Sequence, residues 1–237
     1  PYKARPNLHD VTIRFIRVRP GAAEAISEGG DCLQLTDIDR LILDHVTCSW
    51  GSDENMDLCS SRDITVQWCT IEESDTKGHS EGQHNFGMIM GYAGRDATVH
   101  HNLFAQHKDR APLCGLETLD HRNNVIYNYK SPLQWHPTRM NQQRPNQPFK
   151  ANVVGNYFKA GPNVPRQASE DKLDRMMWKR PWVHLYAADN YFDWAGRVAE
   201  PTVGRFAPPA TTTQPTEEIL SAEKPWPAPA VKTESAK

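Results

Sequence analysis

A short apolar phrase recurs through most of this chain, and its recurrence restricts the possible folds more than any other feature. The copies are VTIRFIRV (11–18), LILDHVTC (41–48), DITVQWCTI (63–71), ATVHHNLF (97–104), LDHRNNVIYN (119–128), KANVVGNYF (150–158) and HLYAADNYF (184–192). Successive copies begin roughly 22 to 34 residues apart, a spacing typical of solenoid and propeller repeats. The sequence therefore predicts a stack of similar units.

Each copy has the pattern of a β-strand. β-branched and aromatic residues alternate with polar ones, and helical apolar spacing is nearly absent before residue 203. A propeller blade needs several strands, for which the shortest copies leave little room. They fit one coil of a parallel β-helix, with longer copies carrying loop insertions, so we predict an all-β solenoid with long insertions at 129–148 and 159–182.

Asparagine stands at one equivalent position in four successive copies. The equivalent residues are Ile16, Val46, Cys69, Asn102, Asn124, Asn156 and Asn190. In stacked coils, side-chain amides at the same turn can hydrogen-bond to the copies above and below. We therefore predict an asparagine ladder, against the alternative that these are ordinary turn asparagines.

The 237 residues divide into a β-helix domain at 1–202 and a Pro-, Thr- and Glu-rich tail at 203–237. We expect the irregular tail to pack on the domain or trail from it, with a short helix around Glu217 to Lys224. The chain opens as though inside a fold, so we also expect it to lack the first coils. The formal net charge is −2 and the longest apolar runs are strand-sized, so we expect a monomer with neither nucleic-acid nor membrane partners.

The chain has five cysteines, without a CxxC pair or a zinc-like spacing. They are Cys32, Cys48, Cys59, Cys69 and Cys114. We expect most of them to be small buried residues of stacked strands. One disulfide stays open as an alternative.

Acidic residues gather at two neighbouring turns. Asp31 precedes the phrase CLQL, and Asp53 and Asp57 lie in GSDENMD, with Glu54 as an additional acid nearby. Stacking would bring the two turns side by side, and converging carboxylates repel one another unless a cation neutralises them. Oxygen ligands suit Ca²⁺, whereas the bland alternative is a solvated acidic turn with a capping aspartate.

Basic side chains follow in the next coils. Lys77, His79 and His84 occupy one loop, and Arg110 follows the copy at 97–104. Each taken alone is an ordinary surface charge. Together they would place positive charge beside the acidic turns, where a guanidinium can clamp a sugar carboxylate. This order favours an enzyme acting on a uronic acid polymer.

At these residues the chain resembles the pectate lyases built on a right-handed parallel β-helix. The phrases that carry the resemblance are TIRFIRVRPG, DCLQL, LDHVTCSWGSDENMD, ITVQWCTIEES, KGHS, VHHNLFAQHKDRAP, RNNVIYN and VVGNYFKAGPN, which cover most of residues 11 to 163. The resemblance implies calcium-dependent β-elimination of polygalacturonate in a secreted or periplasmic protein. It also implies that Asp31, Asp53 and Asp57 bind calcium.

The same resemblance implies roles for the basic residues. Arg110 is the base or the stabiliser of the enolate, and Lys77 and His84 contact substrate. Arg110 is followed by Ala-Pro-Leu, without the family's second arginine, so that charge is either absent or supplied by Arg122, Arg139 or Arg144. Three alternatives stay open: a lyase on another uronate polymer, a non-catalytic carbohydrate-binding β-helix, and a polygalacturonase-like hydrolase with aspartates as acid and base.

Overall fold

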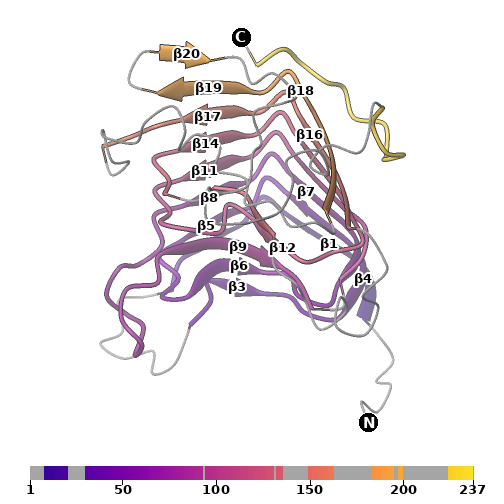
Figure 1. Cartoon of the computed structure of the whole chain (residues 1–237). Helices are drawn as coiled ribbons and strands as arrows, with labels where there is room; N and C mark the ends of the chain where they lie inside the picture. Colours follow the sequence, from indigo (N-terminus) through magenta and orange to yellow (C-terminus); the bar gives the residue numbers. More distant parts are fainter. Residues whose placement is uncertain are drawn as a thin grey trace, which may run out of the picture.

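The protein folds as a parallel β-helix, as predicted (Figure 1). The structure, a computed structural model, describes residues 8–20, 30–92, 94–130, 132–135, 149–162, 183–194, 197–199 and 224–236. The regular secondary structure in these ranges consists of β-strands alone, and the strands form three stacked sheets. In the described part of the chain we find no helix long and apolar enough to cross a membrane.

Sheet A has seven strands in the order in which they follow along the chain. They are β1 (Leu8–Arg14), β4 (Ile38–Asp44), β7 (Arg62–Gln67), β10 (Ala97–His100), β13 (Thr118–Arg122), β16 (Phe149–Val154) and β18 (Val183–Ala188). All neighbours in this sheet are parallel.

Sheet B has eight strands, of which only the last pair is antiparallel. They are β2 (Arg17–Val18), β5 (Thr47–Ser49), β8 (Thr70–Glu72), β11 (Leu103–Ala105), β14 (Val125–Tyr127), β17 (Tyr157–Lys159), β19 (Tyr191–Trp194) and β20 (Arg197–Ala199). The repeated phrase of the sequence thus contains a strand of sheet A, a turn, and a strand of sheet B.

Sheet C has five parallel strands and closes each coil. They are β3 (Leu33–Gln34), β6 (Glu54–Asp57), β9 (Phe86–Met90), β12 (Leu113–Cys114) and β15 (Gln134–Trp135). Its strands lie between the loops that carry the acidic and basic residues, so this sheet positions the candidate site.

The turn from sheet A to sheet B has the same backbone conformation in every copy. The residue before each ladder position has a positive φ, between 52° and 65°: Phe15, His45, Trp68, His101, Asn123, Gly155 and Asp189. Left-handed φ is unusual for side chains as large as Phe and Trp. The sequence did not predict this feature, because only one of the seven residues is a glycine.

The asparagine ladder is confirmed. Asn102 Nδ2 donates to Asn124 Oδ1 at 3.0 Å, and Asn124 Nδ2 donates to Asn156 Oδ1 at 3.0 Å. Asn156 Nδ2 donates to Asn190 Oδ1 at 2.9 Å. All four side chains are buried, and each Oδ1 also accepts a backbone N–H from the preceding coil. The ladder therefore satisfies buried polar groups on the inner side of the turn.

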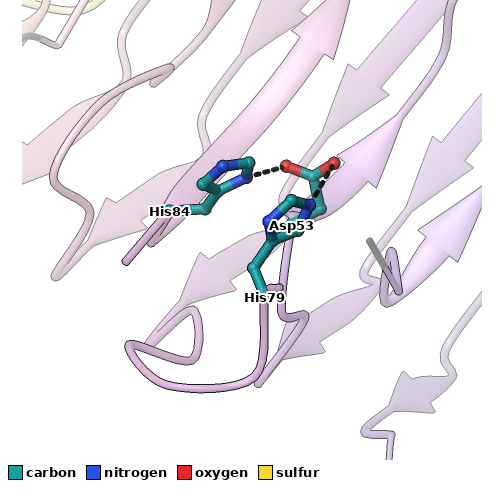
Figure 2. Close-up of side chains that lie close together, drawn as sticks. All are labelled: Asp53, His79 and His84. Carbon is teal, nitrogen blue, oxygen red and sulfur yellow. Dashed lines mark hydrogen bonds and ion pairs between the residues drawn. The ribbon is translucent and has the colours of Figure 1, made fainter. Parts of the chain in front are cut away.

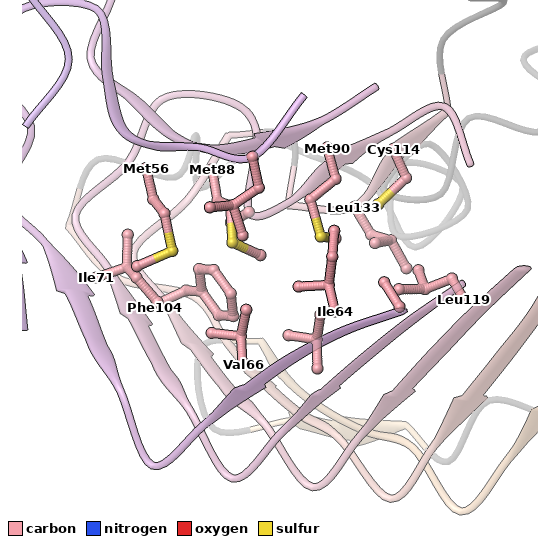
Figure 3. Close-up of a cluster of buried hydrophobic side chains, with 14 of the residues drawn as sticks. Met56, Ile64, Val66, Ile71, Met88, Met90, Phe104, Cys114, Leu119 and Leu133 are labelled. Atoms are coloured by element: carbon pink, nitrogen blue, oxygen red, sulfur yellow. The ribbon is translucent and has the colours of Figure 1, made fainter. Parts of the chain in front are cut away.

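Apolar side chains from all three sheets fill the interior (Figure 3). Met56 and Met88 from sheet C are fully buried, as are Val66 from sheet A and Phe104 from sheet B. The five cysteines are free and buried, so the expectation of small buried residues is confirmed and the disulfide is absent. One apolar core runs along the stack.

Residues 224–236 run along the outer face of sheet A (Figure 1). The Trp226 backbone N–H donates to Asn152 Oδ1 at 2.8 Å, and Asn152 Nδ2 donates back to the Trp226 carbonyl at 3.0 Å. This part of the tail packs on the β-helix. The helix expected around Glu217 and most of the two long insertions lie outside the described residues.

Candidate active site

Three carboxylates converge where two coils enter sheet C. Asp31 precedes β3, while Asp53 and Glu54 stand at the start of the neighbouring strand β6. Oxygens of all three side chains lie within 4.8 Å of one another. The Glu54 backbone N–H donates to Asp31 Oδ1 at 3.0 Å, which ties the two turns together. We call Asp31, Asp53 and Glu54 the acidic cluster.

Asp57 adjoins this cluster but is not part of it. It ends β6, and its Oδ2 accepts a hydrogen bond from Gln34 Nε2 at 3.2 Å. The same amide donates to Asp31 Oδ2 at 3.2 Å. Of the three aspartates predicted to bind a cation, two are therefore brought together, with Glu54 as the third carboxylate beside them.

The acidic cluster is electrostatically unfavourable on its own. Burial raises the pKa of Asp31 to about 6, and the charges of Asp57 and Asp53 act in the same direction. Burial also raises the pKa of Glu54, while Arg110 opposes that rise. A positive charge that neutralises these carboxylates would therefore be favourable.

Arg110 supplies part of that charge. Its Nη1 forms an ion pair with Glu54 Oε1, and its guanidinium carbon lies 3.7 Å from the centroid of the Phe86 ring. The residue lies between β11 and β12, two coils beyond the acidic turns, as the sequence indicated. Its backbone is fixed by Met88 N–H, which donates to the Arg110 carbonyl at 2.6 Å.

Gly87 permits this close packing. A Cβ built at position 87 would collide with the Arg110 carbonyl oxygen and approach the His107 ring to 2.9 Å. Both neighbours are held in place, because the Arg110 carbonyl accepts a backbone bond and His107 is buried. A larger residue here would displace the turn that carries Arg110.

Two histidines of the loop before β9 face Asp53 (Figure 2). His84 Nδ1 lies 2.7 Å from Asp53 Oδ1, and His79 Nε2 lies 3.9 Å from Asp53 Oδ2. The rings stack with centroids 3.5 Å apart, and His84 also packs on Phe86 at 4.6 Å.

The hydrogen-bond partners of His79 and His84 indicate that each ring turns a protonated nitrogen toward Asp53. The Glu81 backbone N–H donates to His79 Nδ1 at 3.1 Å, so Nδ1 is the acceptor and the ring proton is on Nε2, facing Asp53. His84 presents Nδ1 to a carboxylate, which accepts. His84, predicted to contact substrate, therefore holds and orients Asp53 in this structure.

The remaining predicted substrate residues are placed differently. Lys77 is exposed on the same loop, and its ammonium has no ion pair with any residue that the structure describes. Arg122 ends β13 in sheet A, where it binds Asp120 and donates to Thr233 Oγ1 at 2.6 Å. The structure does not bring Arg122 to the acidic cluster. Arg139 and Arg144 lie outside the described residues.

No protein-family model matches the chain. Curated relatives do: "probable pectate lyase C" of Aspergillus terreus is 29% identical over 189 residues, covering 79% of this chain and 40% of the relative. Proteins of the same name from Neosartorya fischeri and Aspergillus fumigatus are 30% identical over the same shares. The chain thus spans about 40% of the length of the curated relatives it matches. This similarity supports a pectate lyase-like family.

Proposed function

We propose that this protein is a pectate lyase-like enzyme that cleaves polygalacturonate by β-elimination at the acidic cluster. The observation that carries the proposal is the convergence of Asp31, Asp53 and Glu54, with Arg110 paired to Glu54. Carboxylates at such short separations favour a cation, and a guanidinium beside them favours an anionic substrate. The names of the relatives agree with this chemistry.

The donor set fits calcium. All ligand atoms in the acidic cluster are carboxylate oxygens, the kind that hard cations prefer, and no cysteine sulfur of the described residues joins them. Asp31, Asp53 and Glu54 would hold the ion, with Asp57 next to them. When bound, calcium would neutralise these carboxylates and withdraw charge from the substrate's C6 carboxylate, which acidifies the C5 proton.

Arg110 acts on the substrate side of the cluster. In the elimination, a base takes the C5 proton and negative charge builds up on the carboxylate. The C4–C5 double bond then forms as the C4 oxygen leaves with the C4–O electron pair and takes up a proton from water. A guanidinium ordinarily keeps its proton. We therefore assign Arg110 the stabilisation of this charge as its minimum role, with proton removal from C5 as the stronger role that the resemblance implies.

Neighbouring residues prepare the site. His84 keeps the Asp53 carboxylate turned toward its ring, and Phe86 supports the Arg110 guanidinium from one face. We assign Lys77, which is exposed on the same loop, to a second substrate carboxylate. A secreted or periplasmic location follows from this proposal, since such polymers belong to cell walls.

The test is ultraviolet absorbance of polygalacturonate incubated with the protein, with calcium in one sample and a chelator in the other. A calcium-dependent rise supports elimination, because the unsaturated product absorbs. If this polymer gives no rise, the same assay on other uronate polymers tests the wider substrate class. No rise on any of them contradicts a lyase. Reducing ends without the chromophore would indicate a hydrolase.

A binding role is the second candidate, because Arg122 is engaged on sheet A and the described residues place no second arginine beside Arg110. Retention of polymer on the protein, without release of unsaturated ends, would favour that role.

A further inference from the structure

Glu54 belongs to two arrangements at once. Its carboxylate pairs with Arg110, and its oxygens also lie within the acidic cluster. We propose that Glu54 is an exchangeable ligand: without a cation it holds Arg110, and with a cation it turns to the ion and releases Arg110 for substrate. This inference deepens the proposed function and rests on it for the identity of the ion.

The need for a counter-charge supports this exchange. The Glu54 side chain is only 5% exposed, and a buried carboxylate without a partner is strongly unfavourable. In the structure Arg110 meets this need. A divalent ion beside Asp31 and Asp53 would meet it better, because it faces three carboxylates at once.

The two partners of the ion pair differ in their freedom to move. Arg110 is 27% exposed, and its guanidinium also lies over the Phe86 ring, a contact that does not involve Glu54. The main chain of Glu54 is tied to Asp31 through its N–H, so only the side chain has to rotate. Exchange therefore needs no change in the coils.

Sheet A provides a matched comparison. Arg122 and Asp120 form a similar ion pair, with side chains 14% and 2% exposed. Asp120 lies in β13, and its further partner is the amide of Asn152. Cation binding at the acidic cluster should leave this pair unchanged.

Thermodynamic linkage makes the proposal measurable. If Arg110 and calcium compete for Glu54, removing Arg110 must strengthen calcium binding. Removing a nearby positive charge would do so as well, simply through the field. The two causes separate in a Glu54→Gln background, where competition disappears but the field effect remains.

The experiment is calcium titration calorimetry on the wild-type chain, Arg110→Gln, Glu54→Gln and the double variant. We expect Arg110→Gln to bind calcium about 5- to 10-fold more tightly, a typical coupling between sites. Glu54→Gln should bind at least about tenfold more weakly, since a charged ligand is lost. In the double variant, the Arg110→Gln change should alter affinity by less than about twofold relative to Glu54→Gln alone. Arg122→Gln, the matched control, should leave calcium affinity unchanged.

Three outcomes would overturn the proposal: equal tightening by Arg110→Gln in both backgrounds, no tightening at all, or no calcium binding by the wild-type chain. If Arg110→Gln does not fold without calcium, Arg110→Lys keeps the charge but loses the planar fork, and an intermediate tightening is expected. Unchanged affinity in that variant would also contradict the exchange.

The binding cycle is independent of turnover. Coupling between Arg110 and calcium without cleavage of polygalacturonate would support the exchange and contradict the proposed function. Cleavage without this coupling would support the proposed function and contradict the exchange.

Discussion

The inner corner between sheets A and B and the entrance to sheet C use the same stacking geometry with opposite results. At the corner, four identical amides satisfy one another from coil to coil. At sheet C, carboxylates from adjacent coils meet, and burial and repulsion raise the pKa of Asp31. An amide has both a donor and an acceptor, whereas a carboxylate only accepts.

This difference shows how a solenoid separates stability from chemistry. Repetition is favourable where the repeated group is its own partner. Where it is not, the stack holds an unfavourable arrangement that an outside charge can relieve. The acidic cluster is such an arrangement, and Arg110 relieves only part of it.

Removing Arg110 should have the largest effect. We expect Arg110→Ala to lower turnover of polygalacturonate about 10²- to 10³-fold, the loss typical when a stabilising donor is removed from an active site. The chain should remain folded by circular dichroism. Arg40→Ala, at an exposed pair with Asp10, is the control and should retain full rates. Near-normal turnover by Arg110→Ala would contradict the role that we propose for Arg110 in the elimination.

Breaking the ladder at its middle should destabilise the corner without direct action on the site. Asn124→Ala removes the Oδ1 that accepts from Asn102 Nδ2 and from the Asn102 backbone N–H, and the Nδ2 that donates to the Val99 carbonyl. We expect a loss of about 2 to 4 kcal/mol in unfolding free energy, measured by denaturant titration. The exposed neighbour Val125→Ala should change it by less than about 0.5 kcal/mol. Equal effects of the two changes would argue against a stabilising ladder.

Asp53→Asn tests the sheet C side. Loss of one charged ligand should weaken calcium binding at least about tenfold, or about 1.4 kcal/mol, and raise the calcium needed for turnover equally. The amide can still accept from His84, so the loop should stay in place. Asp63→Asn, on exposed sheet A surface, is the control. An unchanged calcium requirement would place the metal elsewhere.

Of these tests, a change of pH should have the smallest effect on the protein. The folded-state pKa of Asp31, about 6, exceeds its ordinary value of 3.8, so the native state binds the proton more tightly. The cation-free protein should therefore lose stability as the pH rises through this window. Protons also compete with calcium, so we expect affinity about tenfold weaker at pH 5 than at pH 7. In Asp31→Asn this pH difference should shrink, with the remainder coming from Glu54, whose pKa burial also raises. An unchanged pH difference in this variant would assign it to another group.

The sequence predicted the corner better than the site, for a physical reason. The ladder has one residue type at one position in each coil, so the period itself shows which side chains meet. The Glu54–Arg110 pair joins unlike residues across two coils, and its position depends on how β9 packs between them. Nothing in the spacing of the acids distinguishes Glu54, which enters the cluster, from Asp57, which adjoins it.

Arg122 illustrates a signal that was present in the sequence. It lies inside the repeated phrase LDHRNNVIYN, whose other copies all place that position on sheet A. Arg110 follows its copy and therefore belongs to the connection that leads into sheet C. Arg110 and Arg122 are close along the chain, which suggested a shared site. Their positions in the repeat, however, already placed the two arginines on different faces of the β-helix.

The left-handed turn residues between sheets A and B have a consequence for how this molecule can vary. Seven copies of that turn keep φ between 52° and 65° while the residue changes from phenylalanine to histidine, tryptophan, asparagine, glycine and aspartate. The backbone path, and not the identity of the side chain, defines this edge. Neighbouring rings one coil apart pack against each other there: Phe15 and His45 are tilted with centroids 4.9 Å apart, and Trp68 and His101 stack at 4.3 Å. This edge is thus a regularly spaced row of positions at which the side chain can change while the backbone path of the coil stays the same.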